Sequence, residues 1–276
     1  MKQFPPIPPV EDAPELFESG HLWIQEHVDG ATLRFRLRDS GAFEFGDRSR
    51  VFEPGEVPVS YRHAVRHVRE RVDRAALREA VDDVESVVFV GVATHRRAVD
   101  YDWDRLPSVL GVEVWNDDEG RFLPPDAVEQ AYDRLGLEPV NTVQKEVRAV
   151  DFDPESYDVP ASAWDDGPAA GVVLRNKTGD RATLLRPEVR DADASVPVDA
   201  TPGELAEEYV TRQRVEAVVA ELEDEQRRVA VDTVTDRIVE RLAREEHARL
   251  FGGDRTVDPA AFRSAVAERT SRLLDA

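Results

Sequence analysis

The sequence predicts an α+β fold in which a domain built on antiparallel sheets is followed by an all-α C-terminal module. Short strand patterns separated by turn residues fill the first two-thirds of the chain, which favours antiparallel pairing over a parallel doubly wound sheet. Helical periodicity fills the remainder. An acidic, proline-containing stretch at residues 192–200 separates the two parts, so we place the domains at residues 1–192 and 201–276.

Turn residues and apolar runs define the elements of the first domain. Asp29-Gly30 separates the first two strand patterns, and a second turn at residues 39–41 precedes the third. Apolar residues recur at helical spacing from residue 59 to about residue 84, and Pro125 and Gly136 mark the two ends of a further helix. The remaining apolar runs are typical of strands. We expect strands at residues 22–28, 32–37, 43–45, 87–91, 110–115, 171–174 and 182–185.

The second domain is predicted to be helical to its end. Thr201-Pro202-Gly203-Glu204 has the pattern of a capping box with proline at the first helical position. Apolar stripes follow at residues 215–222 and 234–243, and Asp258-Pro259 begins a last helix. Stripes of valine and leucine are compatible with a homodimer or another protein contact through these helices.

The chain is strongly acidic. It has 57 acidic and 36 basic residues, for a formal net charge of -21, and lysine occurs only at Lys2, Lys145 and Lys177. Dispersed acids with arginine in place of lysine are typical of proteins from a salt-loaded cytoplasm, so we predict a halophilic, archaeal source. This charge would normally argue against nucleic-acid binding, but molar salt screens the repulsion as well as the attraction.

The composition also bears on the compartment. The chain has no cysteine, which excludes a disulfide framework and a thiolate metal site. It has no apolar run long enough to cross a bilayer and no apolar stretch of signal-peptide type at the N-terminus. We therefore expect a cytoplasmic protein without a membrane partner.

Five short segments carry a resemblance to a known family. They are Glu26-His27-Val28-Asp29-Gly30, Phe45-Gly46-Asp47-Arg48-Ser49-Arg50, Val88-Phe89-Val90-Gly91-Val92, the segment at residues 109–116, and Ala170-Gly171-Val172-Val173-Leu174-Arg175. In order and spacing they resemble the motifs of ATP-dependent RNA ligases of the RNA ligase 2 type, which are covalent nucleotidyltransferases. The resemblance spans roughly residues 20–250. It implies a nucleotidyltransferase domain related to those of DNA ligases and capping enzymes, with ATP as the cofactor.

The residues that the family uses for chemistry are replaced in this chain. His27 stands where the family has its lysine nucleophile, and imidazole can attack phosphorus but is shorter and planar. Val92 and Ala170 stand where the family has carboxylates, so the resemblance no longer implies a bound Mg²⁺. Thr183 replaces a lysine of the last strand. We expect a catalytically degenerate protein; the alternative is an active ligase or nucleotidyltransferase with His27 as an atypical nucleophile.

Several residues remain at positions where the resemblance places contacts to a nucleotide or to RNA ends. Arginine binds phosphate bidentately, although pairing with nearby acids explains any one arginine equally well. An aromatic residue can stack on a base or pack at the rim of a core. These candidates are Asp29, Gly30, Arg48, Arg50, Trp115, Arg175 and Arg186. If none of them binds a ligand, the chain is a non-enzymatic interaction protein on the ligase scaffold.

Three histidines invite a metal interpretation. His63 and His67 are four residues apart, and His95 follows a predicted strand. Because the sequence offers no evident carboxylate or cysteine partner for them, we predict that they belong to a solvated surface and that the chain has no metal site.

Overall fold

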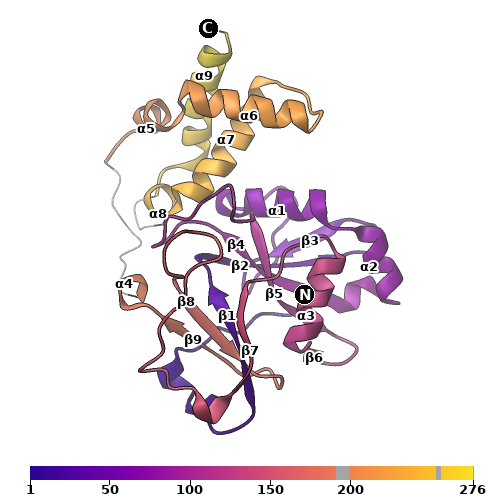
Figure 1. The fold of residues 1–276 in the computed structure, drawn as a ribbon. Coiled ribbons are helices and arrows are strands. Elements are labelled where there is room, and N and C mark those ends of the chain that lie inside the picture. Colours follow the sequence, from indigo (N-terminus) through magenta and orange to yellow (C-terminus); the bar gives the residue numbers. More distant parts are fainter. Residues whose placement is uncertain (191–198, 253–255, 276) are drawn as a thin grey trace. The chain divides into compact units, whose positions relative to one another are not determined.

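The computed structural model describes residues 1–190, 199–252 and 256–275, which form two compact units (Figure 1). The sheet unit comprises Met1–Val57, Ala64–Thr94 and Ala98–Ala192. The helical unit comprises Pro58–His63, His95–Arg97 and Asp193–Ala276. Two short segments from the first half of the chain therefore belong to the helical unit.

The sheet unit contains two antiparallel sheets. One has the order β3 (Phe43–Gly46), β2 (Gly30–Leu37), β4 (Val87–Thr94), β5 (Val109–Asn116) and β6 (Arg121–Phe122). The other has the order β7 (Thr142–Arg148), β1 (His21–His27), β8 (Gly171–Arg175) and β9 (Arg181–Leu185). All pairings between these strands are antiparallel, so the α+β fold class expected from the turn-separated strand patterns is confirmed.

Helices pack beside the five-stranded sheet. They are α1 (Val59–Arg71), α2 (Arg74–Ala80) and α3 (Pro125–Arg134). A short α4 (Pro187–Arg190) follows β9 of the four-stranded sheet. The predicted helix from residue 59 is divided at Asp73, because the Asp73 carboxylate accepts the backbone N–H groups of Ala75 and Ala76 and so begins α2. The α3 residue Tyr132 donates a hydrogen bond to the Val90 carbonyl at 2.8 Å. Its ring lies where a Cβ at Gly111 would be, so glycine is required there.

The helical unit buries the predicted stripes. Its helices are α5 (Pro202–Tyr209), α6 (Arg212–Asp224), α7 (Val231–Glu245), α8 (His247–Leu250) and α9 (Pro259–Leu274). The capping box is confirmed, since Thr201 and Glu204 exchange hydrogen bonds at the start of α5. The buried core of the unit includes Val215, Val218, Leu222, Val234, Ile238, Leu242, Phe262 and Val266. In the described part of the chain, none of the helices has both the length and the apolar character needed to cross a membrane.

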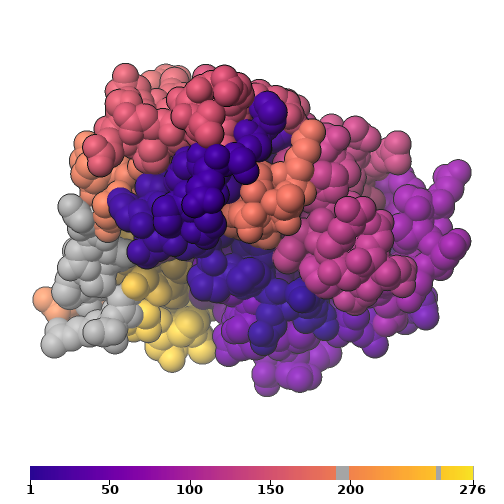
Figure 2. Space-filling model, turned by 90° about the horizontal axis from the view of Figure 1, so that it is seen from below, coloured from indigo at the N-terminus to yellow at the C-terminus, as the bar shows by residue number. Residues whose placement is uncertain are grey.

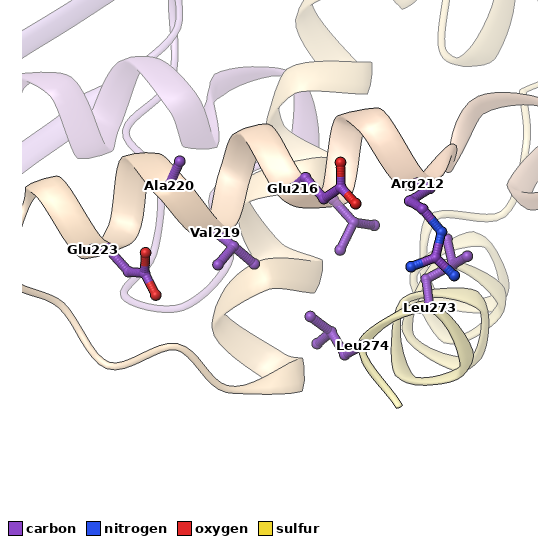
Figure 3. Close-up of a pocket in the computed structure, with 8 residues that line it drawn as sticks. Arg212, Glu216, Val219, Ala220, Glu223, Leu273 and Leu274 are labelled. Atoms are coloured by element: carbon purple, nitrogen blue, oxygen red, sulfur yellow. The ribbon is translucent and has the colours of Figure 1, made fainter. Parts of the chain in front are cut away.

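A groove opens between α6 and the end of α9 (Figure 3). Val219, Leu273 and Leu274 contribute apolar side chains to it, and Glu216 and Glu223 contribute carboxylates. Its volume is about 250 Å³. The homodimer or other protein contact expected through the C-terminal helices stays a prediction. The apolar side chains of this groove mark one place on the helical unit where such a contact can be tested.

The histidines do not lie where the sequence analysis put them. His63 and His95 are only 2% and 3% exposed, so the prediction of a solvated surface was wrong for both. His63 lies in α1, one turn after its start, and the His95 ring lies 3.8 Å from the ring of His247 in α8. Both belong to segments of the helical unit, which the α1 periodicity alone could not indicate.

The pH dependence of stability should carry a contribution from His247. Burial lowers the pKa of His247 to about 4, and the positive charge of Arg97 acts in the same direction. An unfolded histidine titrates near pH 6.5, so the unfolded chain binds more protons between these two values. The free energy of unfolding should therefore fall as the pH drops from about 6.5 to about 4 and then lose this dependence. Urea unfolding of the wild-type chain and of His247→Gln across this range measures it; an identical pH dependence of the two proteins would contradict the assignment.

Candidate functional site

The turn between β1 and β2 brings several predicted site residues together. His27 ends β1 and pairs with Gly171 of β8, which directly follows Ala170. Gly30 opens β2, and a Cβ placed on it would lie 2.5 Å from a methyl carbon of Val92. His27, Gly30, Val92 and Ala170 therefore lie near one another in the sheet unit.

The carboxylate of Asp29 is engaged within the protein. It is buried, and its Oδ2 accepts the backbone N–H groups of Ala98 at 2.6 Å and of Val99 at 2.9 Å. The backbone N–H of Asp29 donates to the hydroxyl of Tyr101 at 3.1 Å. Burial raises the pKa of the Tyr101 hydroxyl, and the charge of Asp29 raises it further, so this hydroxyl stays protonated. Asp29 thus fixes the segment after β4 onto the turn.

Glu26 is also engaged, although the sequence analysis did not single it out. Only 1% of it is exposed. Its Oε1 accepts the Ser162 hydroxyl at 2.5 Å. Its Oε2 accepts the Ala163 backbone N–H and the Asn141 side-chain amide, both at 3.0 Å. Both carboxylates that flank His27 in the sequence therefore serve as acceptors for protein donors.

An apolar cluster lies at the same turn. Val28, between His27 and Asp29, packs with buried Tyr101 and Leu110. Partly buried side chains complete this Val28 cluster, and they include Val99, Trp103, Val112 and Trp164. Aliphatic and aromatic groups at the turn offer no compensation for the desolvation of a triphosphate.

Arg186 is the predicted arginine that the structure places at this site. Its backbone N–H donates to the Ala170 carbonyl at 3.1 Å. Its positive charge acts on the Tyr101 hydroxyl and opposes the rise of the Tyr101 pKa. Among the described residues, its buried Nε has no hydrogen-bond partner. A donor of this kind can be satisfied by an anion that enters the site.

Arg48 and Arg50 lie in the loop that follows β3. Gly46, just before them, pairs with Arg34, which is four residues along the strand from Gly30. The side chain of Arg50 is 69% exposed and pairs with Asp47 at 2.7 Å. The guanidinium of Arg50 is therefore already engaged by an acid of its own motif.

The side chains of Trp115 and Arg175 are both engaged by neighbouring side chains of the protein. The Lys2 ammonium lies 3.9 Å from the centre of a Trp115 ring, and Phe122 packs against Trp115 edge to face. Arg175 is 2% exposed and forms an ion pair with Glu113 at 2.9 Å. For both residues the geometry agrees with the alternative interpretation weighed from the sequence, namely rim packing for Trp115 and acid pairing for Arg175.

The position of the missing lysine on β9 is covered by the N-terminal segment. The backbone N–H of Thr183 donates to the Pro8 carbonyl at 2.8 Å, and Pro9 forms a bridge with the same residue. Figure 2 shows the N-terminal residues in indigo against the orange β8–β9 segment. Thr183 therefore anchors the start of the chain to the edge of the four-stranded sheet.

The residues at the turn do not fit a divalent ion with its triphosphate. In the described ranges, no group of three or more histidine, aspartate or glutamate side chains is arranged to hold a metal. Glu26 and Asp29 already accept hydrogen bonds, and Val92 and Ala170 have no donor atom to offer. Oxygen ligands from carboxylates are what Mg²⁺ requires from a protein in such a site.

Comparison with known proteins bears on the fold. No family model matches the sequence, and no curated protein does. The structure resembles an archaeal ATP-dependent RNA ligase with a TM-score of 0.53 and 16% identity, covering 70% of this chain and 51% of that one. It also resembles a variant of the Naegleria gruberi RNA ligase with ATP and Mn, with a TM-score of 0.51 and 12% identity, covering 67% and 56% of the two chains. The chain thus spans about half the length of these structures, and the likeness shows an RNA-ligase nucleotidyltransferase fold.

Proposed function

We propose that this chain is a catalytically inactive protein on an RNA-ligase scaffold, and that it binds phosphorylated RNA ends instead of joining them. One observation carries the proposal. The two carboxylates that flank His27, Glu26 and Asp29, both accept hydrogen bonds from protein groups. Carboxylates held in this way support the fold and do not hold a metal ion against a nucleotide.

The same observation weighs against nucleotidyl transfer by His27. Attack on the α-phosphate of ATP needs the triphosphate aligned with the nucleophile and its charge neutralised. The Val28 cluster supplies no charge for this purpose, and the family's carboxylate positions hold Val92 and Ala170. His27 accordingly belongs to the scaffold in this proposal, and ATP is not its preferred ligand.

Arg186 supports phosphate binding at the same place. Its guanidinium is half-buried beside the turn, with a buried Nε that lacks a partner in the described part of the chain. A planar guanidinium can hold two oxygens of one phosphate. A terminal 5′-phosphate on RNA carries the negative charge and the free oxygens that such a group binds, without a need for the metal.

We expect 5′-phosphorylated RNA to bind about tenfold more tightly than the same RNA with a 5′-hydroxyl, because one charge-assisted contact contributes about 1.5 kcal/mol. Fluorescence anisotropy with both RNAs measures the preference. Arg186→Gln should abolish it. The matched control is Arg190→Gln, since Arg190 lies one helical turn further on and pairs with Glu11 at 3.4 Å.

Two outcomes would overturn the proposal. One is a preference for the 5′-phosphate that survives in Arg186→Gln. The other is equal affinity of the wild-type chain for the two RNAs. If the wild-type chain binds neither RNA nor nucleotide, the chain is an interaction protein that kept only the ligase scaffold.

A further inference from the structure

Two arginines lie on aromatic rings of the edge strand β3. The guanidinium carbon of Arg69, near the end of α1, is 5.3 Å from the centre of the Phe45 ring. The guanidinium carbon of Arg74, at the start of α2, is 4.9 Å from the centre of the Phe43 ring. Arg74 also donates from Nη2 to the Arg69 carbonyl at 3.3 Å. Both guanidinium groups are therefore held in place while the residues that carry them remain exposed.

Arg78 continues this line by one step. It lies one helical turn after Arg74 in α2, and its Nη2 donates to the Asp39 carbonyl at 3.2 Å. The same nitrogen is 3.7 Å from the position of a Cβ on Gly41. Arg78, Arg74 and Arg69 thus lie in order beside residues 41, 43 and 45 of one chain segment, and we call them the arginine row.

The row follows the side chains of one strand. The ring centres of Phe43 and Phe45 are 5.9 Å apart, and each ring carries one guanidinium group, that of Arg74 or that of Arg69. Successive phosphates of an extended single nucleic-acid strand are separated by a similar distance. A row of this kind therefore suits an extended single strand.

The charges of the row are available. Among the described residues, none of its three arginines forms an ion pair, although arginine–carboxylate pairs occur throughout this acidic chain. The neighbouring acid Glu70 pairs with Arg66 at 3.2 Å. The Asp73 carboxylate accepts the first backbone N–H groups of α2. Two exposed acids lie at the Arg78 end: Glu79 follows Arg78 in the sequence, and Asp39 accepts the Arg78 hydrogen bond through its backbone carbonyl.

We propose that the arginine row binds the sugar–phosphate backbone of single-stranded RNA without reading its bases. Stacked guanidinium groups lose little freedom on binding and keep their N–H edges for phosphate oxygens. The row lies along β3, whereas Arg186 follows β9 in the other sheet. The inference therefore adds a second contact with its own residues and does not depend on recognition of the RNA end.

The test uses the full chain and a fluorescent oligouridylate with a 5′-hydroxyl, titrated over a series of KCl concentrations. For single strands, the slope of log K against log salt changes by about 0.7 per phosphate contact. Combining Arg69→Gln, Arg74→Gln and Arg78→Gln should make the slope shallower by about 2, and each single change should contribute about 0.7. Arg71→Gln is the matched control, because Arg71 is an exposed arginine at the end of α1 outside the row. Circular dichroism verifies that each variant is folded.

The row is refuted if the triple variant keeps the wild-type slope, or if Arg71→Gln changes the slope as much as a single row variant. It is also refuted if polyglutamate competes as well as unlabelled RNA of equal charge, or if the wild-type chain does not bind this RNA. These experiments distinguish a failure of the arginine row from a failure of the proposed binding of RNA ends. The triple variant should keep any 5′-phosphate preference, and Arg186→Gln should keep the wild-type salt slope for the 5′-hydroxyl RNA.

Discussion

Glu113→Ala should lower the free energy of unfolding by about 3–5 kcal/mol, the typical cost of breaking a buried ion pair by removing one partner. Glu113 is 3% exposed and lies between Arg175 and Arg181, each at 2.9 Å. Arg181 also lies over the rings of Phe4 and Phe122. Without the carboxylate, two buried guanidinium groups would be left with no opposite charge between them.

Urea unfolding, followed by circular dichroism, measures this effect. The matched control is Glu119→Ala, since Glu119 pairs with Arg121 at 2.6 Å but both side chains are largely exposed, at 42% and 67%. We expect that control to change stability by less than about 1 kcal/mol. A loss below about 1 kcal/mol for Glu113→Ala itself would show that the triad is not a structural centre of the sheet unit.

Arg34→Ala should cost about 3 kcal/mol, because it leaves several buried carbonyl groups without a donor. Arg34 is a fully buried side chain in β2. Its guanidinium donates to the carbonyls of Met1, Lys2, Asp47 and Arg50. It thereby fastens the start of the chain to the loop after β3. Arg34→Lys should recover only part of the loss, since a single ammonium cannot reach carbonyls in four directions.

Two measurements distinguish the anchoring role of Arg34 from the effect of removing any arginine of this strand. Unfolding of Arg36→Ala is the control, because Arg36 lies two residues along the same strand and its pair with Glu44 at 2.7 Å is partly exposed. We expect that control to cost about 1 kcal/mol or less. Release of the first residues should also alter Trp115 fluorescence in Arg34→Ala, because Lys2 lies over that ring. Unchanged fluorescence together with wild-type stability would contradict the assignment.

Much of the fold could be predicted from turn chemistry and periodicity. The strands around Asp29-Gly30 and the capped helix at Thr201 were found because local patterns determine them. β7 was missed, since its sequence Thr-Val-Gln-Lys-Glu-Val-Arg has too few apolar residues to show a strand alternation. The grouping of Pro58–His63 and His95–Arg97 with the helical unit was missed as well, because it depends on contacts distant in sequence.

The sequence predicted the candidate site only where neighbouring motifs lie on strands that meet in the sheet. His27, Gly30 and Val92 come together because β1, β2 and β4 meet at one turn. The order of motifs does not say which side chains are already engaged within the protein, and Arg50 pairs with Asp47 of its own motif. Buried charges such as Glu26, Arg34 and Glu113 were missed, since on an alternating strand they resemble exposed ones. The halophilic, archaeal source stays a prediction from composition.

Covalent adenylylation tests the central claim most directly. The wild-type chain, His27→Ala and His27→Lys are incubated with α-labelled ATP and Mg²⁺ or Mn²⁺ at high KCl, and label on the protein is measured. We predict no covalent adenylate on any of the three, because a lysine at position 27 would still lack the carboxylates replaced by Val92 and Ala170. A stable adenylate on the wild-type chain, acid-labile as a phosphoramidate is and absent from His27→Ala, would contradict the account and identify His27 as a working nucleophile.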